Sequence, residues 1–297
     1  MARHPSNWGQ IMGYKRVLTA ALMIPLLYVI VQYAGPRAFF FLVLSGVMIG
    51  LYEFYRMFKN SGYRPQTFVG MFVGALVICG FYVGAELPDW QYAKVFSPDV
   101  MVAFAFVVAL LFRLFSRKDI NGAMVDVALT FTGVVYVAWL SAYAILLRAW
   151  KTPDVDGRQL IFFLFAVTWA TDTGAYYIGR RLGRHKLYQK ISPQKSWEGA
   201  VGGLLAAIGM SLLCRIWFYQ ELPLHDALGL GIVLGIVGQA GDLAESMIKR
   251  SARTKDSGGI FPGHGGYLDR VDSMLLNAPA LYYYTLVELA SKGMTLK

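Results

Sequence analysis

The sequence predicts an all-α fold, a polytopic integral membrane bundle of about nine transmembrane helices. Of its 297 residues, 56% are hydrophobic and only 15% are charged, whereas soluble domains carry about 25% charged residues. Uncharged segments such as Val17–Pro36, Pro65–Ala85 and Val127–Leu147 are long enough to cross a hydrocarbon core of about 30 Å as helices. The net charge of +10 is spread among the loops between such segments. This pattern favours anionic membrane lipids and phosphate substrates as partners, and no nucleic acid.

Nine apolar segments are the predicted spans. The first follows Lys15 and Arg16, as a secretory signal would. It lacks a small-residue cleavage site and exceeds a usual signal core, so we interpret it as a retained helix. The fourth is the weakest because Arg113 lies within it. The predicted spans are 17–35, 38–57, 66–85, 99–116, 124–147, 159–179, 197–219, 226–248 and 269–289.

The distribution of basic residues predicts the orientation, because lysine and arginine concentrate in cytoplasmic loops. A cytoplasmic N-terminus places 20 of the 28 lysines and arginines inside and 8 outside. The first five spans then form an N-terminal unit, 1–158, and the last four form a catalytic unit, 159–297. Its loops 180–197 and 249–268 are the most basic, and both face the cytoplasm, where nucleotides are available. We therefore expect a multi-pass protein of a cell inner membrane with a cytoplasmic active site.

Four carboxylates are predicted to lie at similar depth on three helices. Asp172 and Asp242 each precede the next basic residue by seven or eight positions, which places them roughly 10–12 Å from the cytoplasmic helix ends. Asp269 and Asp272 begin the ninth span on one helix face. Carboxylates of this kind hold Mg²⁺ together with phosphate oxygens and water. A buried salt-bridge seam would explain one or two such residues, but not the glycine-rich loop beside them.

That loop joins the eighth and ninth spans and follows a polar helix stripe. Its glycines let backbone amides approach a phosphate closely, and the positive end of the ninth helix points into it. A flexible turn is the alternative, but the basic residues beside the glycines favour phosphate binding. His264 either hydrogen-bonds phosphate or braces the turn, and both readings stay open. The stripe is Asp242, Glu245, Ser246 and Lys249. The loop holds Lys255, Gly258, Gly259, Gly263, His264, Gly265 and Gly266, and Arg270 follows it.

A second polar segment precedes the seventh span. It runs from Ser192 to Gly199 after five basic residues, and Lys195 and Ser196 are its candidates for phosphate binding. The same residues before an apolar helix are also typical of a plain helix start with capping. The sequence leaves these two interpretations open.

Together the two segments resemble the phosphatidate cytidylyltransferases, also called CDP-diacylglycerol synthases. Tyr267 departs from that family's usual aliphatic residue or Phe and is expected to add a hydroxyl near the site. The resemblance is firm over about 169–273 and covers the N-terminal half only as a hydrophobic bundle. It rests on WATDTGAYYIGRRLG (169–183), SPQKSWEG (192–199) and a C-terminal motif formed by Ser246, Lys249, Arg250, Lys255, Asp256, His264, Gly265, Gly266, Asp269, Arg270 and Asp272.

The resemblance implies a membrane enzyme of phospholipid biosynthesis. Such an enzyme joins CTP to phosphatidic acid, releases pyrophosphate, requires magnesium and forms a homodimer. It also implies that Asp242 and Asp269 bind the metal, and we expect Asp172 and Asp272 to support it or a second cation. The residues expected to clamp phosphates are Lys249, Arg250, Lys255 and Arg270, with Lys195 and Ser196 from the other loop and with Ser246, His264, Gly265 and Gly266.

Two other functions use similar parts. A different lipid-phosphate nucleotidyltransferase or a polyprenol kinase would differ in its acceptor. A cation-coupled transporter would also need acids within the membrane. Transport favours acids deep in broken helices, whereas these gather near one face beside basic loops.

Overall fold

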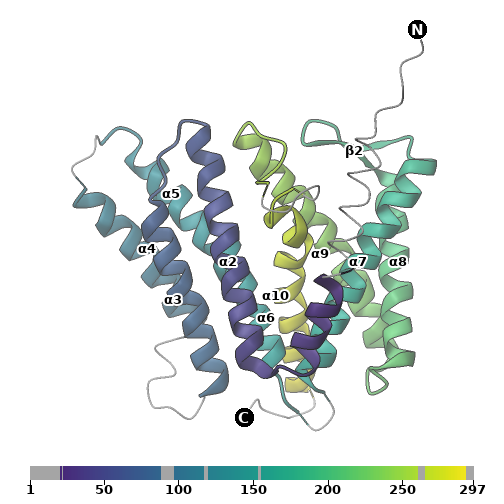
Figure 1. Ribbon diagram of the computed structural model, residues 1–297. Coiled ribbons are helices and arrows are strands. Elements are labelled where there is room, and N and C mark those ends of the chain that lie inside the picture. The colour runs from purple at the N-terminus through teal and green to yellow at the C-terminus, as the bar shows by residue number, and fades with distance from the viewer. Residues whose placement is uncertain are drawn as a thin grey trace.

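The protein is a bundle of long helices with a small β-hairpin at one end (Figure 1). The computed structural model describes residues 21, 23–87, 97–116, 120–152, 155–259 and 265–291. Within these residues each predicted span contains a helix, starting with the short Met23–Gln32. The others are α2 (Gly35–Asn60), α3 (Thr67–Glu86), α4 (Pro98–Leu114), α5 (Ala123–Gly133) continued by η2 (Val134–Trp139) and α6 (Leu140–Ala149), α7 (Gly157–Leu182), α8 (Trp197–Trp217), α9 (Leu224–Ser251) and α10 (Leu268–Ser291).

Length and composition suit several of these helices to a membrane. In the described part of the chain five are long and apolar enough to cross one: α2, α3, Ala123–Ala149, α8 and α9. α4 is shorter, and its Arg113 is buried in an ion pair with Asp126, 3.3 Å away. α7 and α10 carry polar residues such as Asp172 and Asp269 and fall outside the five. The prediction of a largely helical chain with several membrane-crossing helices is therefore confirmed for the described residues.

The β-hairpin is a departure from the predicted all-α fold. β1 (Lys186–Tyr188) pairs antiparallel with β2 (Ser192–Ser196). A loop of this length would leave many backbone groups unpaired, and the hairpin joins them to each other. Glu198, in the first turn of α8, fastens the hairpin by accepting backbone N–H bonds from Arg184 and His185 at 3.1 and 3.2 Å. The hairpin was not predicted because β2, with five residues, has no alternation of apolar and polar residues.

Helix packing follows chain order in the C-terminal half, where α7 packs on α8, α8 on α9 and α9 on α10. Close glycines allow this: Gly199 and Gly203 face α7, and Gly231 and Gly235 face α8. These small-residue pairs therefore serve contacts within the chain. α6 contacts α2 and α3 on one side and α7 and α10 on the other, so it joins the two halves (Figure 1). The division at residue 158 stays a prediction.

The polar loops gather at one end of the bundle, the upper end in Figure 1. The turn after α2, the hairpin and the segment after α9 all lie there. Ser61, at the end of α2, donates its hydroxyl to the carbonyl of Ala252, just past α9. Chain segments far apart in sequence thus meet where the polar motifs were predicted to converge.

Candidate active site

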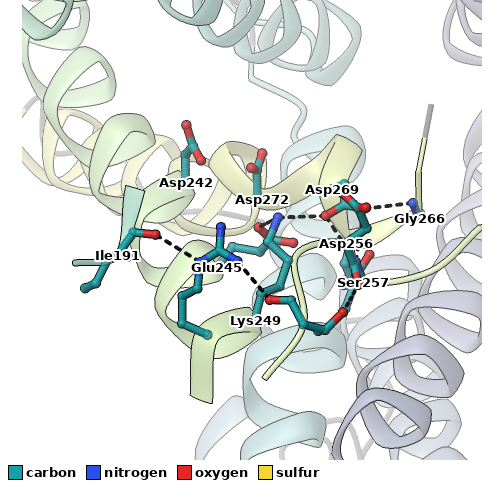
Figure 2. Close-up of polar contacts among 12 residues, drawn as sticks. Ile191, Asp242, Glu245, Lys249, Asp256, Ser257, Gly266, Asp269 and Asp272 are labelled. Atoms are coloured by element: carbon teal, nitrogen blue, oxygen red, sulfur yellow. Dashed lines mark hydrogen bonds and ion pairs between the residues drawn. The ribbon is translucent and has the colours of Figure 1, made fainter. Parts of the chain in front are cut away.

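Three carboxylates from three helices lie near one another at this end. Asp172 lies on α7, Asp242 on α9 and Asp272 on α10, close enough for their charges to repel. Figure 2 shows Asp242 and Asp272 pointing to the same side. Ser273 donates its hydroxyl to Asp172 at 3.3 Å. The predicted meeting of acids from three helices is present for these three side chains.

Lys195 brings a positive charge to the same place from the hairpin. Its ammonium lies 2.7 Å from a carboxylate oxygen of Asp242, and both side chains are partly exposed. The hairpin therefore contributes a positive charge that partly neutralises Asp242. Lys195 and Asp242, which the sequence placed in separate motifs, belong to one site.

A second charged group lies one helix turn further along α9. The Lys249 ammonium lies between the carboxylates of Glu245 and Asp269, and its distance to Asp269 is 2.7 Å. All three side chains are largely buried, with exposed fractions of 14%, 2% and 10%. Two carboxylates thus contact one ammonium in a buried position. A buried ion pair offsets the cost of removing its charges from water only if its geometry is good and additional hydrogen bonds are made.

Asp269 makes such additional hydrogen bonds by accepting backbone N–H groups of the glycine-rich loop. It accepts the backbone N–H of Gly266 at 2.8 Å and that of Ser257 at 3.2 Å. Gly265 beside it has φ +81°, a left-handed conformation that favours glycine. Figure 2 shows Asp269 turned towards Gly266 and away from Asp242.

The four predicted acids are therefore divided between two positions. Asp172, Asp242 and Asp272 form one group, while Asp269 pairs with Lys249. Among the described residues, no three His, Cys, Asp or Glu side chains are close enough to form a metal site as they stand. Joint metal binding by Asp242 and Asp269 stays a prediction.

The remaining predicted residues lie around these groups. Arg250 donates to the carbonyl of Ile191 in the hairpin turn and to that of Thr254, both at 3.2 Å, so it joins the two loops. Lys255 and Arg270 are exposed, and Ser246 is half-buried on α9. His264 lies outside the described residues. The roles assigned to these side chains stay predictions.

Ser196 has a clear structural role. It is 4% exposed, and its hydroxyl accepts the backbone N–H of Gly199 at 3.1 Å, which caps α8. The capping interpretation is confirmed, and phosphate binding by this residue stays a prediction.

Ser196→Ala is expected to destabilise the protein by about 1 kcal/mol, because the first turn of α8 loses its cap. Thermal unfolding in detergent measures this change. A KM for CTP that is unchanged in Ser196→Ala would leave capping as its role, whereas a KM raised more than about tenfold would add phosphate binding.

Sequence reasoning missed Glu53 on α2. This side chain is 2% exposed and accepts the backbone N–H of Leu268 at 3.1 Å and the Ser257 hydroxyl at 3.3 Å. A lone carboxylate in the apolar predicted span 38–57 was the available signal. Tyr267, expected to place a hydroxyl near the site, instead packs its ring against Gly46 and Gly50 of α2.

Comparison with known proteins decides the family. The model of the cytidylyltransferase family matches residues 14–287. The chain belongs to this family. The match includes the N-terminal half, which the sequence motifs had related to the family only as a hydrophobic bundle, and it therefore includes α2 with Glu53.

Members of the family with similar sequences come from distant bacteria. The chain is 30% identical over 269 residues to the phosphatidate cytidylyltransferase of Bacillus subtilis, covering 91% of this chain and 96% of the relative. It is 30% identical to that of Synechocystis, covering 94% and 98%. For the Brucella suis protein of the same name the identity is 35%, covering 81% and 83%.

Proposed function

We propose that this chain transfers the cytidylyl group of CTP to phosphatidic acid, giving CDP-diacylglycerol and pyrophosphate in phospholipid biosynthesis. The name of its full-length relatives supports this activity. The observation that carries it is the gathering of Asp172, Asp242 and Asp272 beside Lys195, at the bundle end that also holds the glycine-rich loop. At this end of the bundle, carboxylates suited to a hard cation lie beside positively charged side chains and backbone amides suited to phosphate.

The donor chemistry suits a magnesium ion, whose shell would be completed by water and by phosphate oxygens of the substrate because the three carboxylates do not form a metal site by themselves. Asp172, Asp242 and Asp272 offer hard oxygen ligands, and their mutual repulsion makes a cation favourable between them. A magnesium ion held there would supply positive charge to neutralise the phosphates. We assign Asp242 to it first, with Asp172 and Asp272 supporting this ion or a second cation. Asp269 joins them only if it leaves Lys249.

The transfer itself needs little covalent chemistry from the protein. An oxygen of the lipid phosphate, already anionic near neutral pH, attacks the α-phosphorus of CTP, and pyrophosphate departs on the opposite side. Catalysis then rests on positioning and charge neutralisation. Lys195 is placed to pass from Asp242 to a phosphate oxygen once substrate arrives. Arg250, Lys255 and Arg270 lie at the same end and supply further positive charge.

The remaining proposals concern the setting. We place the polar end of the bundle at the cytoplasmic face of an inner membrane, with nine crossings, because the basic residues gather at that end. We also propose a homodimer. The GxxxG pairs do not support the dimer, since they are used within the chain.

The experiment that tests this function offers purified protein in detergent two acceptors. We expect label from α-labelled CTP to enter chloroform-soluble lipid with phosphatidic acid and not with undecaprenyl phosphate. ATP in place of CTP is the nucleotide control. Labelling with the isoprenoid acceptor alone would replace the proposed substrate.

Metal removal is a separate prediction. Treatment with EDTA is expected to lower transfer at least about 10²-fold, because the phosphate charge is then met by side chains alone. Added Mg²⁺ is expected to restore it. Full activity in EDTA, with the protein shown to be metal-free, would remove magnesium from the proposal.

A further inference from the structure

Glu53 is a buried charge in the half of the chain that carries no recognised site motif. It lies about two turns before the end of α2 and is followed in sequence by the buried apolar residues Phe54, Tyr55 and Met57. Removing a carboxylate from water costs several kcal/mol unless hydrogen bonds compensate. Packing alone therefore does not explain why a glutamate occupies this position.

The bonds of Glu53 join the two sides of the glycine-rich loop. One carboxylate oxygen accepts from the hydroxyl of Ser257, after α9, and from the backbone N–H of Leu268, the first residue of α10. The negative charge also stands at the positive end of α10, where it is favourable. Glu53 thus acts as an N-terminal cap for α10 that is supplied by a distant helix.

Two glycines fit the loop closely around this carboxylate. A Cβ atom added at Gly258 or at Gly266 would overlap the carboxylate of Glu53. The backbone amides of Gly266 itself and of Ser257, which precedes Gly258, donate to Asp269. The loop ends are therefore held between two carboxylates, Glu53 from α2 and Asp269 from α10.

This arrangement connects Glu53 to the catalytic charges. Asp269 is bonded to the loop amides and to Lys249 at once. A shift of the loop ends would therefore move Asp269, and with it the Lys249 ammonium. Within the described part of the chain Glu53 bonds to Ser257 and Leu268 and not to Lys195 or Asp242, so its influence passes through the loop.

We propose that Glu53 is a positioning residue for the reaction. It fixes the loop ends so that Asp269 and Lys249 keep the geometry needed for phosphate binding, and it does not touch the substrate. The proposal rests on the proposed function of the same site. It gives the N-terminal half a direct part in the catalytic geometry.

The test compares Glu53→Leu, which removes both acceptor bonds, with Glu53→Gln, which keeps an acceptor oxygen. We expect Glu53→Leu to lower kcat at least tenfold, since small displacements of catalytic groups cost up to about 10²-fold. Glu53→Gln is expected to stay within about threefold of wild type. Hydrogen exchange of peptides covering 257–259 and 265–268 is expected to accelerate in Glu53→Leu only, with α7 and α8 unchanged.

Gln66→Leu is the matched control. Gln66 is also a buried polar residue of the N-terminal half, and its side chain donates to the carbonyl of Ala109 at 3.1 Å, away from the loop. This variant is expected to lower thermal stability while keeping kcat and loop exchange as in wild type. Equal loss of kcat in Gln66→Leu and Glu53→Leu would show a general structural effect and overturn the proposal.

Ser257→Ala keeps the test decisive if Glu53→Leu does not fold. It removes one of the two hydrogen bonds to Glu53 and is expected to lower kcat about threefold. Full activity of folded Glu53→Leu would overturn the proposal, and if Glu53→Leu does not fold, wild-type kcat in Ser257→Ala would do so. Absence of transfer in wild type would refute the proposed function instead, and loop exchange would still test the Glu53 contacts.

Discussion

Asp242→Asn is expected to reduce cytidylyl transfer by at least about 10²-fold, because the substitution removes a charge from the group of Asp172, Asp242 and Asp272 while preserving side-chain shape. The partner ammonium of Lys195 then loses its counter-charge at 2.7 Å. The pair is partly exposed, so we expect only a small change in stability. The measurement is the initial rate of lipid labelling, with size-exclusion chromatography to show that the variant is folded.

Asp226→Asn is the control for that prediction. Asp226 is a buried carboxylate at the other end of the same helix and accepts a hydrogen bond from Tyr284 at 2.5 Å. We expect this variant to keep nearly full activity. Normal activity in Asp242→Asn would remove Asp242 from the site, and an equal loss in both variants would point to damage along α9.

Lys249→Met is expected to lower both stability and activity, because it leaves the buried carboxylates of Glu245 and Asp269 facing each other without a counter-charge. Removing one partner of a buried ion pair costs about 3–5 kcal/mol. For a protein of this size such a loss lowers Tm by roughly 10 °C. The loop amides bonded to Asp269 are also displaced, so transfer is expected to fall at least about 10²-fold.

Lys59→Met serves as the comparison for Lys249→Met. Lys59 lies exposed near the end of α2, where a single charge contributes little to stability. Its Tm and activity are expected to match wild type. A Tm for Lys249→Met within about 2 °C of wild type would contradict a stabilising role for the Glu245–Lys249–Asp269 group.

Much of the helical architecture could be predicted because a membrane span has a simple signature. Length and apolarity located segments such as 66–85 and 197–219, which the structure shows as α3 and α8. The hairpin could not be located this way. Its strands are short and polar, and the structure depends on Glu198 accepting two amides across the loop.

The candidate site was predicted in part for a similar reason. Spacing along α9 and α10 placed Asp242, Lys249 and Asp272 on the correct helices at the correct end. It did not indicate the ion pair of Asp269 with Lys249, because Asp269 is directed by the backbone amides of Ser257 and Gly266. Glu53 was missed because its partners lie more than 200 positions away in the chain. No local pattern carries such contacts.

The most direct test of the proposed reaction follows the phosphorus atoms of CTP. Purified wild-type protein would be given phosphatidic acid, Mg²⁺ and CTP labelled at either the α or the γ phosphorus. We predict that α-label enters the chloroform-soluble product and that γ-label is released as pyrophosphate. Transfer of γ-label to lipid would instead show a kinase and contradict cytidylyl transfer at this site.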